Sequence, residues 1–419
     1  MTSLTKTIDA IARKARASSI VLGDTAQDKV DNCLRSLAGL LDAQKDALVK
    51  ANRKDIALAR AKRLAAPMID RLTLSDKAFE SMKKGLNAVA DLSTPVGSIF
   101  DEHVRPNGLT IYKMKVPIGV IAIIYESRPN VTVDAASLCL KSRNSVILRG
   151  GSEAFFSNKA LAALIARACA GAGLPGDAVQ LVPTTDRKAI DMLLTKDNDI
   201  DLVIPRGGEG LIRAVVEKSR IPVIKHYKGV CHVYVSRFAD MAKALPIVVN
   251  AKVQRPGVCN AMETLLLDKA LSNPNKLKIL SALVEKGVIL YGDPAVRRLV
   301  PSAKRATRDD WFAEYLDLRL AVRVVDNVGE AISHINAFGS HHTDAIVTDS
   351  KEEADQFVRL VDSSSVMVNA STRFSDGGEY GMGAEIGIST DKLHARGPMG
   401  VADLTTYKWV VRGNGQIRS

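Results

Sequence analysis

The residue of this sequence best suited to covalent chemistry is a cysteine in the stretch VQRPGVCNAMET. Pro256 and Gly257 precede Cys259 and the polar Asn260 follows it, which is the composition of a turn rather than of an apolar core. The apolar LPIVVNAKV before the turn fits a strand or a helix, and AMETLLLDKAL after it predicts a helix. Because the amides and dipole of a helix N-terminus stabilise a thiolate, this arrangement predicts that Cys259 is a nucleophile.

The remaining cysteines and the histidines indicate neither disulfides nor a metal site. The chain has five cysteines: Cys33, Cys139, Cys169, Cys231 and Cys259. Their number is odd and they form no CxxC pair, which suits a reducing compartment. The histidines lack the HExxH spacing of a zinc site, and the adjacent His341 and His342 are expected to point apart. No metal is therefore expected, and Cys231 with His232 is interpreted as a core pair rather than a dyad.

Length and composition indicate a globular protein of two or three domains, since 419 residues can bury more than one core. The net charge is +12, but aromatic residues are only 5% and no dense Lys/Arg run is interleaved with them, so nucleic-acid binding is not expected. The positive charge is interpreted as a solvated basic surface, and the alternative is a field that attracts small anionic substrates. No apolar run approaches the roughly 20 residues of a membrane helix, and the first residues lack a signal-peptide core. We therefore expect no membrane association and a cytoplasmic location.

The apolar spacing predicts helices first and alternating elements later. Val30, Leu34, Leu37, Leu41 and Leu48 recur at helical intervals within a first hundred residues that are predicted to be helical. A PNG turn then separates two predicted strands. Strands and helices alternate from there to the end, in two successive runs. The pattern predicts two α/β domains, each with a parallel, doubly wound sheet.

Two Arg-Gly-Gly turns are candidate phosphate sites. ILRGGSE and VIPRGGEG both place glycines between a predicted strand and a predicted helix, where backbone amides face an anion and Arg149 or Arg206 adds charge. A pair of such turns in one parallel sheet suits a nucleotide with several phosphates. By contrast GAGLPG, which matches G-x-G-x-x-G, follows a predicted helix and precedes a strand, so it is interpreted as a helix end.

Five longer stretches carry a resemblance to a known family. They are YESRPNVTVDAASLCLKSRNSVILRGGSEA, VIKHYKGVCHVYV, VQRPGVCNAMETLL, FSDGGEYGMGAEIGIST and LHARGPMG. Together they resemble the aldehyde dehydrogenase superfamily over nearly the whole chain, and within it the branch that reduces the acyl phosphate of glutamate. The resemblance implies an α/β subunit with a cofactor-binding domain, a catalytic domain and a small β flap for oligomerisation. The implied boundaries are 1–100 and 121–232 for the cofactor-binding domain, 233–370 for the catalytic domain, 371–404 for a return segment, and 101–120 with 405–419 for the flap.

The resemblance also implies a reaction and its partners. L-glutamate 5-phosphate would be reduced by NADPH to L-glutamate 5-semialdehyde and phosphate, through a thioester on Cys259, as a step of proline biosynthesis. A homo-oligomer is implied, and the lability of an acyl phosphate favours a complex with glutamate 5-kinase. The alternative is another aldehyde dehydrogenase-like oxidoreductase that forms an acyl thioester. A thiol hydrolase or acyltransferase without a nucleotide is disfavoured by the two Arg-Gly-Gly turns.

Individual positions inherit roles from the resemblance. Cys259 falls on the nucleophile of the family, and Asn130 falls on the asparagine of the oxyanion hole. Arg149 replaces a lysine that binds the adenosine ribose in many relatives, and Glu314 matches the glutamate that binds the nicotinamide ribose. Hydrolytic relatives have a water-activating glutamate where this chain has His226, which favours a reductase and requires His226 to lie near Cys259.

The remaining candidates bind the cofactor or the substrate. Gly150, Gly207, Gly208 and Glu209 lie in the Arg-Gly-Gly turns and are predicted to face the cofactor. The substrate carries a phosphate and a carboxylate, which arginines bind well. Arg255 and Arg373 are the preferred candidates, with His226 as a further group that can hold phosphate as a cation. Arg128 and Arg396 are weaker candidates.

Overall fold

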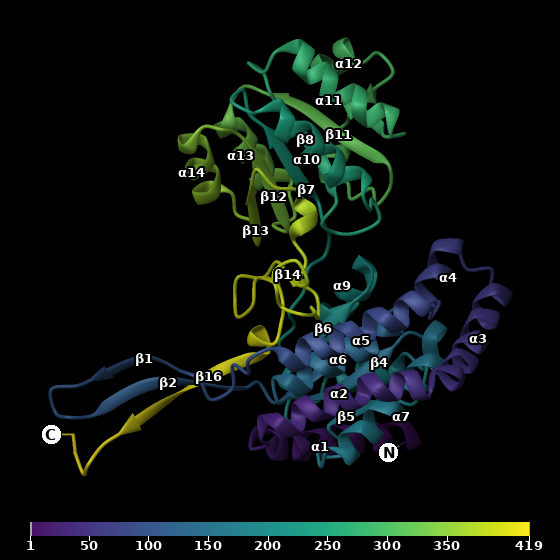
Figure 1. The fold of residues 1–419 in the computed structure, drawn as a ribbon, viewed down its shortest axis with the longest axis vertical. Coiled ribbons are helices and arrows are strands. Elements are labelled where there is room, and N and C mark those ends of the chain that lie inside the picture. Colours follow the sequence, from purple (N-terminus) through teal and green to yellow (C-terminus); the bar gives the residue numbers. More distant parts are fainter. Residues whose placement is uncertain (1, 419) are drawn as a thin grey trace. The chain divides into compact units, whose positions relative to one another are not determined.

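The computed structural model describes residues 2–418, which form two compact units. Unit 1 contains the chain up to Lys225, residues 381–387 and the chain from Met399 onward. Unit 2 contains residues 226–380 and 388–398 (Figure 1). Each unit has its own parallel sheet, so the predicted fold class with two α/β domains is confirmed.

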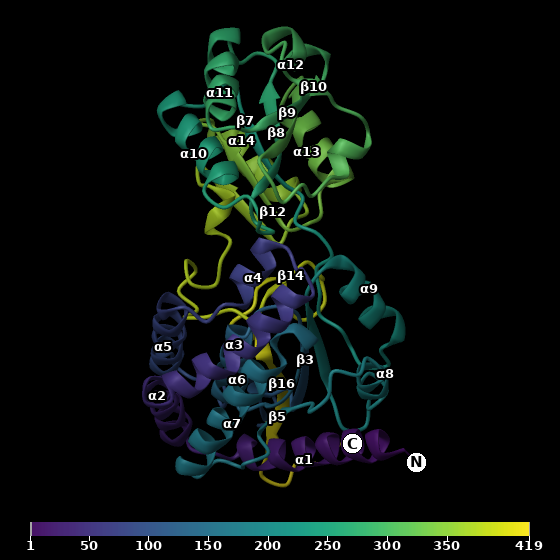
Figure 2. The same ribbon diagram turned by 90° about the vertical axis from the view of Figure 1, so that its right-hand side faces the viewer.

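Helices form most of unit 1, as the apolar spacing of its first hundred residues predicts. Val30, Leu34, Leu37 and Leu41 of the second helix are all fully buried. The helices of unit 1 are α1 (Ser3–Gly23), α2 (Gln27–Ala43), α3 (Lys45–Ala61), α4 (Ala66–Leu72), α5 (Asp76–Asp91), α6 (Asn130–Lys141), α7 (Phe155–Gly171), α8 (Lys188–Leu193) and α9 (Glu209–Lys218). Figure 2 shows α2, α6 and α7 on one side of the strands, with α8 and α9 on the other.

A parallel four-stranded sheet lies between these helices. Its strands are β3 (Val120–Tyr125), β4 (Ser145–Gly150), β5 (Val179–Leu181) and β6 (Leu202–Arg206), in the order β5-β4-β3-β6. Alternate residues of β3, Val120, Ala122 and Ile124, share a core with α1 and α8. In this order β4 and β5 lie on one side of β3, and β6, which comes later in the sequence, lies on the other side. The strand order therefore reverses at β3. In such sheets ligands bind at the carboxyl ends of the strands beside this reversal.

A three-stranded antiparallel ribbon also belongs to unit 1. Its strands are β1 (Ile99–Val104), β2 (Thr110–Pro117) and β16 (Thr405–Arg412), in the order β1-β2-β16 (Figure 1). Trp409 and Tyr407 on β16 are exposed, which fits a surface that another chain covers. The predicted β flap is present, and its role in oligomerisation stays a prediction.

Unit 2 is built on a seven-stranded parallel sheet. Its strands are β7 (Cys231–Val235), β8 (Met262–Asp268), β9 (Ile289–Gly292), β10 (Lys304–Arg305), β11 (Arg319–Val325), β12 (Thr343–Val347) and β13 (Ser365–Val368), in the order β10-β9-β11-β8-β7-β12-β13. Its helices are α10 (Met241–Val253), α11 (Asn273–Glu285), α12 (Pro294–Leu299), α13 (Val328–Phe338) and α14 (Lys351–Leu360). Two short strands, β14 (Ile388–Ser389) and β15 (Gly397–Pro398), form a separate antiparallel pair.

The stretch after Cys259 differs from its prediction, because AMETLLLDKAL is mainly strand β8 and not a helix. All seven residues of β8 are buried, and the strand lies between β7 and β11 in the middle of the sheet. Leu265 and Leu267 pack in the core that includes α10 and α11, whereas Leu266 packs in the core that includes α13 and α14. A strand buried on both faces is apolar throughout, so its sequence cannot be told from a buried helix by periodicity.

The division between the units also differs from the predicted domain boundaries. Unit 2 begins at His226, whereas residues 226–232 were predicted to belong to the cofactor-binding domain. The reason is that β7 pairs with β8 and β12, so Cys231 and His232 belong to the larger sheet. The predicted return segment is shared between the units, since 381–387 and 399–404 belong to unit 1. Within the described residues, no helix is long and apolar enough to cross a membrane.

Candidate active site

Cys259 lies in a turn of unit 2 between α10 and β8 and is half-buried. The predicted helix N-terminus is therefore absent, because a helix precedes the thiol and a strand follows it. The turn is held by its neighbour Asn260, whose amide donates to the Ser375 carbonyl at 2.9 Å. The Asn260 carbonyl in turn accepts from the Thr372 hydroxyl at 2.7 Å. Chain contacts, and not a helix dipole, position this thiol.

Two histidines lie beside the thiol. One ligand atom of each of His226 and His342 lies within 4.8 Å of the Cys259 sulfur and of the other histidine's atom. We call these three side chains the thiol–imidazole cluster. The two rings meet edge to face, with centroids 5.5 Å apart. The predicted proximity of His226 to Cys259 is thus fulfilled, and its chemical role stays a prediction.

The hydrogen bonding of His226 identifies its tautomer. Nδ1 of His226 is 2.8 Å from the carbonyl oxygen of Ile388. Since a carbonyl oxygen only accepts, Nδ1 carries the proton, and the lone pair of the neutral ring is on Nε2. His226 therefore presents a proton acceptor to whatever faces its second nitrogen.

His342 was not predicted as a site residue. His341 has a φ of 60°, in the left-handed region, and its half-buried ring turns toward Asp362, to whose carbonyl oxygen Nδ1 is hydrogen-bonded at 2.5 Å. His342 is fully buried, with Nδ1 2.9 Å from the Thr343 hydroxyl and 3.7 Å from the Cys231 sulfur. The two adjacent rings do point apart, as expected, and one of them points into the site. The cluster lies at the amino ends of β7, β8 and β12, the opposite edge from the usual ligand edge of a parallel sheet.

Gly229 and Glu314 fix the backbone of the thiol turn. A Cβ on Gly229 would lie 1.9 Å from the carbonyl oxygen of Cys259, so only glycine allows this approach. The Gly229 amide donates to a carboxylate oxygen of Glu314 at 2.8 Å. The Cys231 thiol donates to the Cys259 carbonyl at 3.1 Å, which makes Cys231 a support of the turn. Glu314 therefore has a structural contact beside the thiol, and its predicted binding of the nicotinamide ribose stays a prediction.

A buried ion pair joins the residues before and after the same turn. Nζ of Lys252, near the end of α10, lies 2.6 Å from Oε2 of Glu263 on β8, and both side chains are fully buried. The other carboxylate oxygen of Glu263 accepts from the Leu316 amide at 3.0 Å. Burial raises the pKa of Glu263 to about 7 and lowers the pKa of Lys252, while the mutual attraction of the pair opposes both shifts. The pair ties both ends of the Cys259 turn to the segment that carries Glu314.

The predicted substrate arginines lie near each other in unit 2. Arg373 is half-buried and its Nε donates to the Gln254 side chain at 2.7 Å. Burial lowers the pKa of Arg373, the Arg255 cation lowers it further, and nearby Asp376 and Cys259 oppose this. Arg255 is exposed. Two cations gathered near the thiol fit an anionic substrate, whereas Arg396 is engaged in an ion pair with Asp362 at 2.7 Å.

Asn130, the predicted oxyanion-hole residue, begins α6 in unit 1. Its amide donates one hydrogen bond to Oδ2 of Asp134 at 2.9 Å, which fixes the orientation of the amide plane. Burial raises the pKa of Asp134 to about 6, while this hydrogen bond and the Arg206 cation oppose the shift. The second amide proton of Asn130 is not used in that bond, so the residue can still donate to a substrate oxygen.

The first Arg-Gly-Gly turn of unit 1 is filled by its own side chains. A Cβ on Gly150 would lie 2.0 Å from the Asn158 amide, and one on Gly151 would lie 2.1 Å from the Glu153 carboxylate. Arg149 donates to the Gly150 carbonyl at 2.8 Å and to the Thr185 carbonyl at 3.1 Å, and its Nε is buried without a partner. Close packing of β4 on α7 therefore explains Gly150, and its contact with a cofactor stays a prediction.

The second Arg-Gly-Gly turn is more open. A Cβ on Gly208 would meet nothing within 4 Å, although one on Gly207 would lie 2.3 Å from the Glu126 carboxylate. Gly208 is the N-cap of α9, whose first residue Glu209 pairs with Arg213. This turn ends β6, beside the point where the strand order reverses. Its position fits the phosphates of a nucleotide, which would replace the Glu126 carboxylate that accepts from the Gly208 amide at 3.0 Å.

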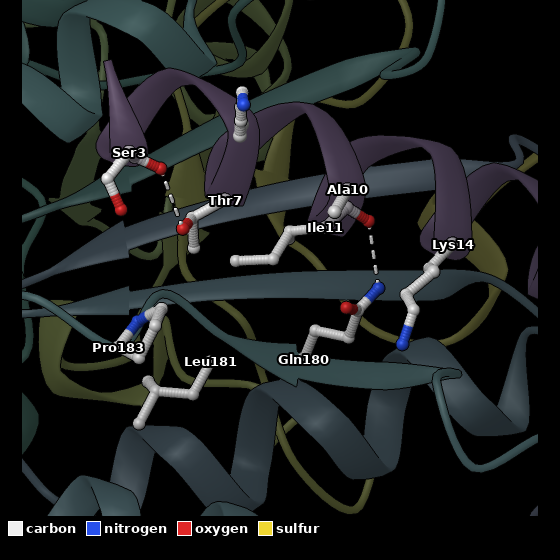
Figure 3. Close-up of a pocket in the computed structure, with 9 residues that line it drawn as sticks. Ser3, Thr7, Ala10, Ile11, Lys14, Gln180, Leu181 and Pro183 are labelled. Atoms are coloured by element: carbon white, nitrogen blue, oxygen red, sulfur yellow. Dashed lines mark hydrogen bonds between the residues drawn. The ribbon is translucent and has the colours of Figure 1, made fainter.

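A surface groove on unit 1 is unrelated to these residues. It lies along α1 and β5 and has a volume of about 470 Å³ (Figure 3). It is lined by Ser3, Lys6, Thr7, Ala10, Ile11, Lys14, Gln180, Leu181 and Pro183. Gln180 closes part of it by donating to the Ile11 carbonyl at 2.9 Å. None of the predicted site residues lines the groove.

The sequence of the chain matches one family model over more than half of its length. The model described as the aldehyde dehydrogenase family matches residues 2–295. The chain is therefore a member of the aldehyde dehydrogenase family, which confirms the predicted fold class.

Comparisons with individual proteins define a narrower class than the family model does. The chain is 54% identical to a gamma-glutamyl phosphate reductase of Desulfatibacillum aliphaticivorans over 98% of both proteins. It is 43% identical to the crystal structure of a gamma-glutamyl phosphate reductase from Thermotoga maritima, with a TM-score of 0.96 over 98% of this chain and 100% of the other. A more distant structure, an engineered glycolyl-CoA reductase with bound NADP+, shares the fold at 16% identity and a TM-score of 0.68, covering 96% of each chain. Within its family, the chain belongs with the gamma-glutamyl phosphate reductases.

Proposed function

We propose that this chain reduces L-glutamate 5-phosphate to L-glutamate 5-semialdehyde and phosphate with NADPH, as a step of proline biosynthesis. The name shared by its relatives supports the substrate. The observation that carries the chemistry is the thiol–imidazole cluster, which places a half-buried thiol within 4.8 Å of two imidazoles. A thiol beside a proton acceptor can become the nucleophile that an acyl phosphate requires.

The covalent steps use atoms of unit 2. Nε2 of His226 can accept the thiol proton, because Nδ1 is committed to the Ile388 carbonyl. The Cys259 sulfur then attacks the carbonyl carbon, phosphate leaves, and a thioester remains on Cys259. Collapse of the reduced adduct releases the semialdehyde and restores the thiol. Covalent catalysis thus divides one difficult substitution and reduction into two easier steps.

The residues of unit 1 fit a nicotinamide dinucleotide. Gly208 leaves open space at the N-terminus of α9, and Arg149 keeps one buried donor without a partner. We assign the cofactor to Arg149, Gly207, Gly208 and Glu209, with Gly150 shaping the neighbouring turn, and we assign Glu314 to the nicotinamide ribose. When bound, the reduced nicotinamide supplies a hydride to the thioester carbon.

Charge stabilisation completes the proposal. The Asn130 amide and the backbone amide of Cys259 are assigned to the oxyanion of each tetrahedral adduct, and donors of this kind contribute roughly 3 kcal/mol each. Arg255, Arg373 and His226 are assigned to the phosphate and carboxylate of the substrate, which two cations and an imidazole can neutralise. The homo-oligomer, the complex with glutamate 5-kinase and the cytoplasmic location stay predictions.

The test runs the reaction backward from stable reagents. Glutamate semialdehyde, inorganic phosphate and NADP+ are mixed with the protein, and the absorbance of the reduced nicotinamide is followed. We expect a phosphate-dependent rise that is faster with NADP+ than with NAD+. A rise with coenzyme A that phosphate cannot produce would favour the alternative, an oxidoreductase that forms a different acyl thioester. No rise with either acceptor would contradict the proposed function.

A further inference from the structure

Three segments distant in the sequence bring the thiol–imidazole cluster together. His226 precedes β7, Cys259 precedes β8 and His342 directly precedes β12. These strands are neighbours in the order β8-β7-β12 and pair in parallel, so their amino ends lie at one edge of the sheet. Sheet pairing therefore fixes where the three side chains start, and their ligand atoms all lie within 4.8 Å of one another.

We propose that the thiol–imidazole cluster is a binding site for a thiophilic divalent cation, Zn²⁺, which reversibly blocks the catalytic thiol. Binding replaces the thiol proton: Cys259–SH and Zn²⁺ give a Cys259 thiolate–zinc bond and a released proton, without any change of oxidation state. While the sulfur holds zinc it cannot attack a substrate carbonyl. Zinc binding depends on the cluster alone, whereas the block of turnover rests on the proposed function, in which Cys259 is the nucleophile.

The ligand set selects the metal. One thiolate and two neutral imidazoles suit zinc, whereas magnesium and calcium prefer oxygen ligands. In a tetrahedral zinc site such atoms lie about 3.5 Å apart, given bonds of about 2.0–2.3 Å. Since the atoms here are at most 4.8 Å apart, a shift of about an ångström closes the site around the ion.

The surroundings of the cluster support ligation. A histidine that binds zinc commonly donates its other ring N–H to a carbonyl, which orients the ring and fixes the tautomer. His226 already makes this contact with Ile388 at 2.8 Å. His342 is fully buried and its Nδ1 is held against Thr343 at 2.9 Å, so its ring has a fixed orientation. Two of the three ligands are thus oriented before an ion arrives.

The site has three ligands and a half-buried thiol, which leaves the fourth zinc position to water. The nearby cations Arg255 and Arg373 disfavour a further positive charge. Both features indicate an ion that exchanges rather than a permanent structural zinc. Zinc binding should therefore be reversed by a chelator, with full return of the free thiol.

The test uses Co²⁺ as a spectroscopic probe and Zn²⁺ as the competitor. Protein is treated with a chelator, freed of it, kept reduced with a phosphine and titrated with CoCl₂. A cobalt–thiolate charge-transfer band should appear and saturate at one equivalent, and ZnCl₂ should remove it. One equivalent of Zn²⁺ should also slow alkylation of Cys259 by iodoacetamide.

Variants assign the ligands independently of activity. Cys259→Ser should abolish the charge-transfer band, and His226→Gln or His342→Gln should weaken Zn²⁺ binding by more than the roughly 10–100-fold that loss of a supporting hydrogen bond causes. His103→Gln changes an exposed histidine of the β flap and should leave binding unchanged. Circular dichroism of each variant confirms folding.

The outcomes against the proposal are specific. A band that survives Cys259→Ser but disappears in Cys231→Ser would assign the metal to the buried thiol and overturn the proposal. So would the absence of any thiolate band in folded wild-type protein, or equal Zn²⁺ affinity in wild type and both histidine variants. Because these readouts do not require turnover, they stand apart from the phosphate-dependent assay of the proposed function.

Discussion

Each unit of the molecule contains a close pair of cysteines, and the two pairs have opposite surroundings. In unit 1, the sulfurs of Cys33 on α2 and Cys169 on α7 lie 3.8 Å apart and both side chains are fully buried. In unit 2, Cys231 is buried and its thiol donates to the carbonyl of Cys259, which is itself half-buried. Within residues 2–418, imidazoles lie beside the second pair and not beside the first. The difference shows that the neighbours of a thiol, and not its residue type, determine whether it can react.

Burial disfavours the charged thiolate and so raises the pKa of a thiol. Burial raises the pKa of Cys139, and for Cys169 a hydrogen bond from Cys33 and burial act in the same direction. Burial also raises the pKa of Cys231 well above its ordinary value. Of the five cysteines, all within the described residues, Cys259 alone is not buried. Cys231 therefore supports the reactive thiol without competing with it.

The largest expected effect tests directly whether the two cysteine pairs differ in reactivity. Cys259→Ser should lower turnover at least about a thousandfold, because a hydroxyl near pH 7 is a far weaker nucleophile than a thiol. Cofactor binding should persist, since the assigned cofactor residues lie mainly in unit 1. The matched control is Cys33→Ala, which changes the unit 1 pair and should retain turnover. Steady-state assays check this, and a serine variant with wild-type turnover would refute the mechanism.

The next effect concerns stability. Lys252→Met should lower the free energy of unfolding by roughly 3–5 kcal/mol, because it leaves the fully buried Glu263 carboxylate without its cation. Urea unfolding measures the change. Lys243→Met is the control, since its ion pair with Asp349 is half-exposed and contributes little. If Lys252→Met were as stable as Lys243→Met, the buried Lys252–Glu263 ion pair would make no contribution to the stability of the protein.

A third effect concerns His334, a buried imidazole of unit 2 outside the thiol–imidazole cluster. Burial, with help from His232 and Arg323, lowers the pKa of His334 to about 3. Because the pKa of His334 in the folded protein lies below the unfolded value near 6.5, the unfolded chain takes up a proton first as the pH falls. The stabilisation is therefore full above pH 6.5 and declines toward pH 3 by about 1.4 kcal/mol per pH unit. His334→Leu should flatten the decline in urea midpoint between pH 6.5 and 4. An unchanged decline would assign the acid sensitivity to other groups.

The smallest expected effect sharpens the role of His226. A glutamate in its place would be a general base beside the thioester, so His226→Glu should divert part of the acyl group to water. The ratio of phosphate released to NADPH oxidised should then rise above one. His226→Gln supplies no base and should keep the ratio at one, at a lower rate. A ratio of one in both variants would mean that packing alone excludes water.

Much of the fold follows from the sequence, because local patterns determine it. Strand and helix alternate in both units as predicted, and the GAGLPG stretch does follow a helix, α7, and precede β5. The prediction of a helix after Cys259 was wrong because β8 is buried on both faces. A strand with apolar residues on both faces shows no alternation of apolar and polar residues. Only the tertiary position of β8 distinguishes it from a buried helix.

The site was less predictable, because contacts between distant segments build it. The location of Cys259 in a turn and the nearness of His226 were predictable, the second only through the family resemblance. His342 was not, since nothing in the sequence says which amino ends of strands become neighbours. Lys252 and Glu263 had a readable signal that was missed: a lysine in LPIVVNAKV and a glutamate in AMETLLL are charges inside apolar runs, and buried charges must pair.

The most direct test of the central claim is capture of the acyl group on Cys259. Glutamate semialdehyde and NADP+ are supplied without phosphate, so that the reaction stops at the thioester, and the protein is quenched in acid. Intact-mass spectrometry should show the gain of one glutamyl group, digestion should place it on the peptide that contains Cys259, and added phosphate should remove it. Reduction of NADP+ without any covalent adduct, or a glutamyl group on Cys231 instead, would contradict the account.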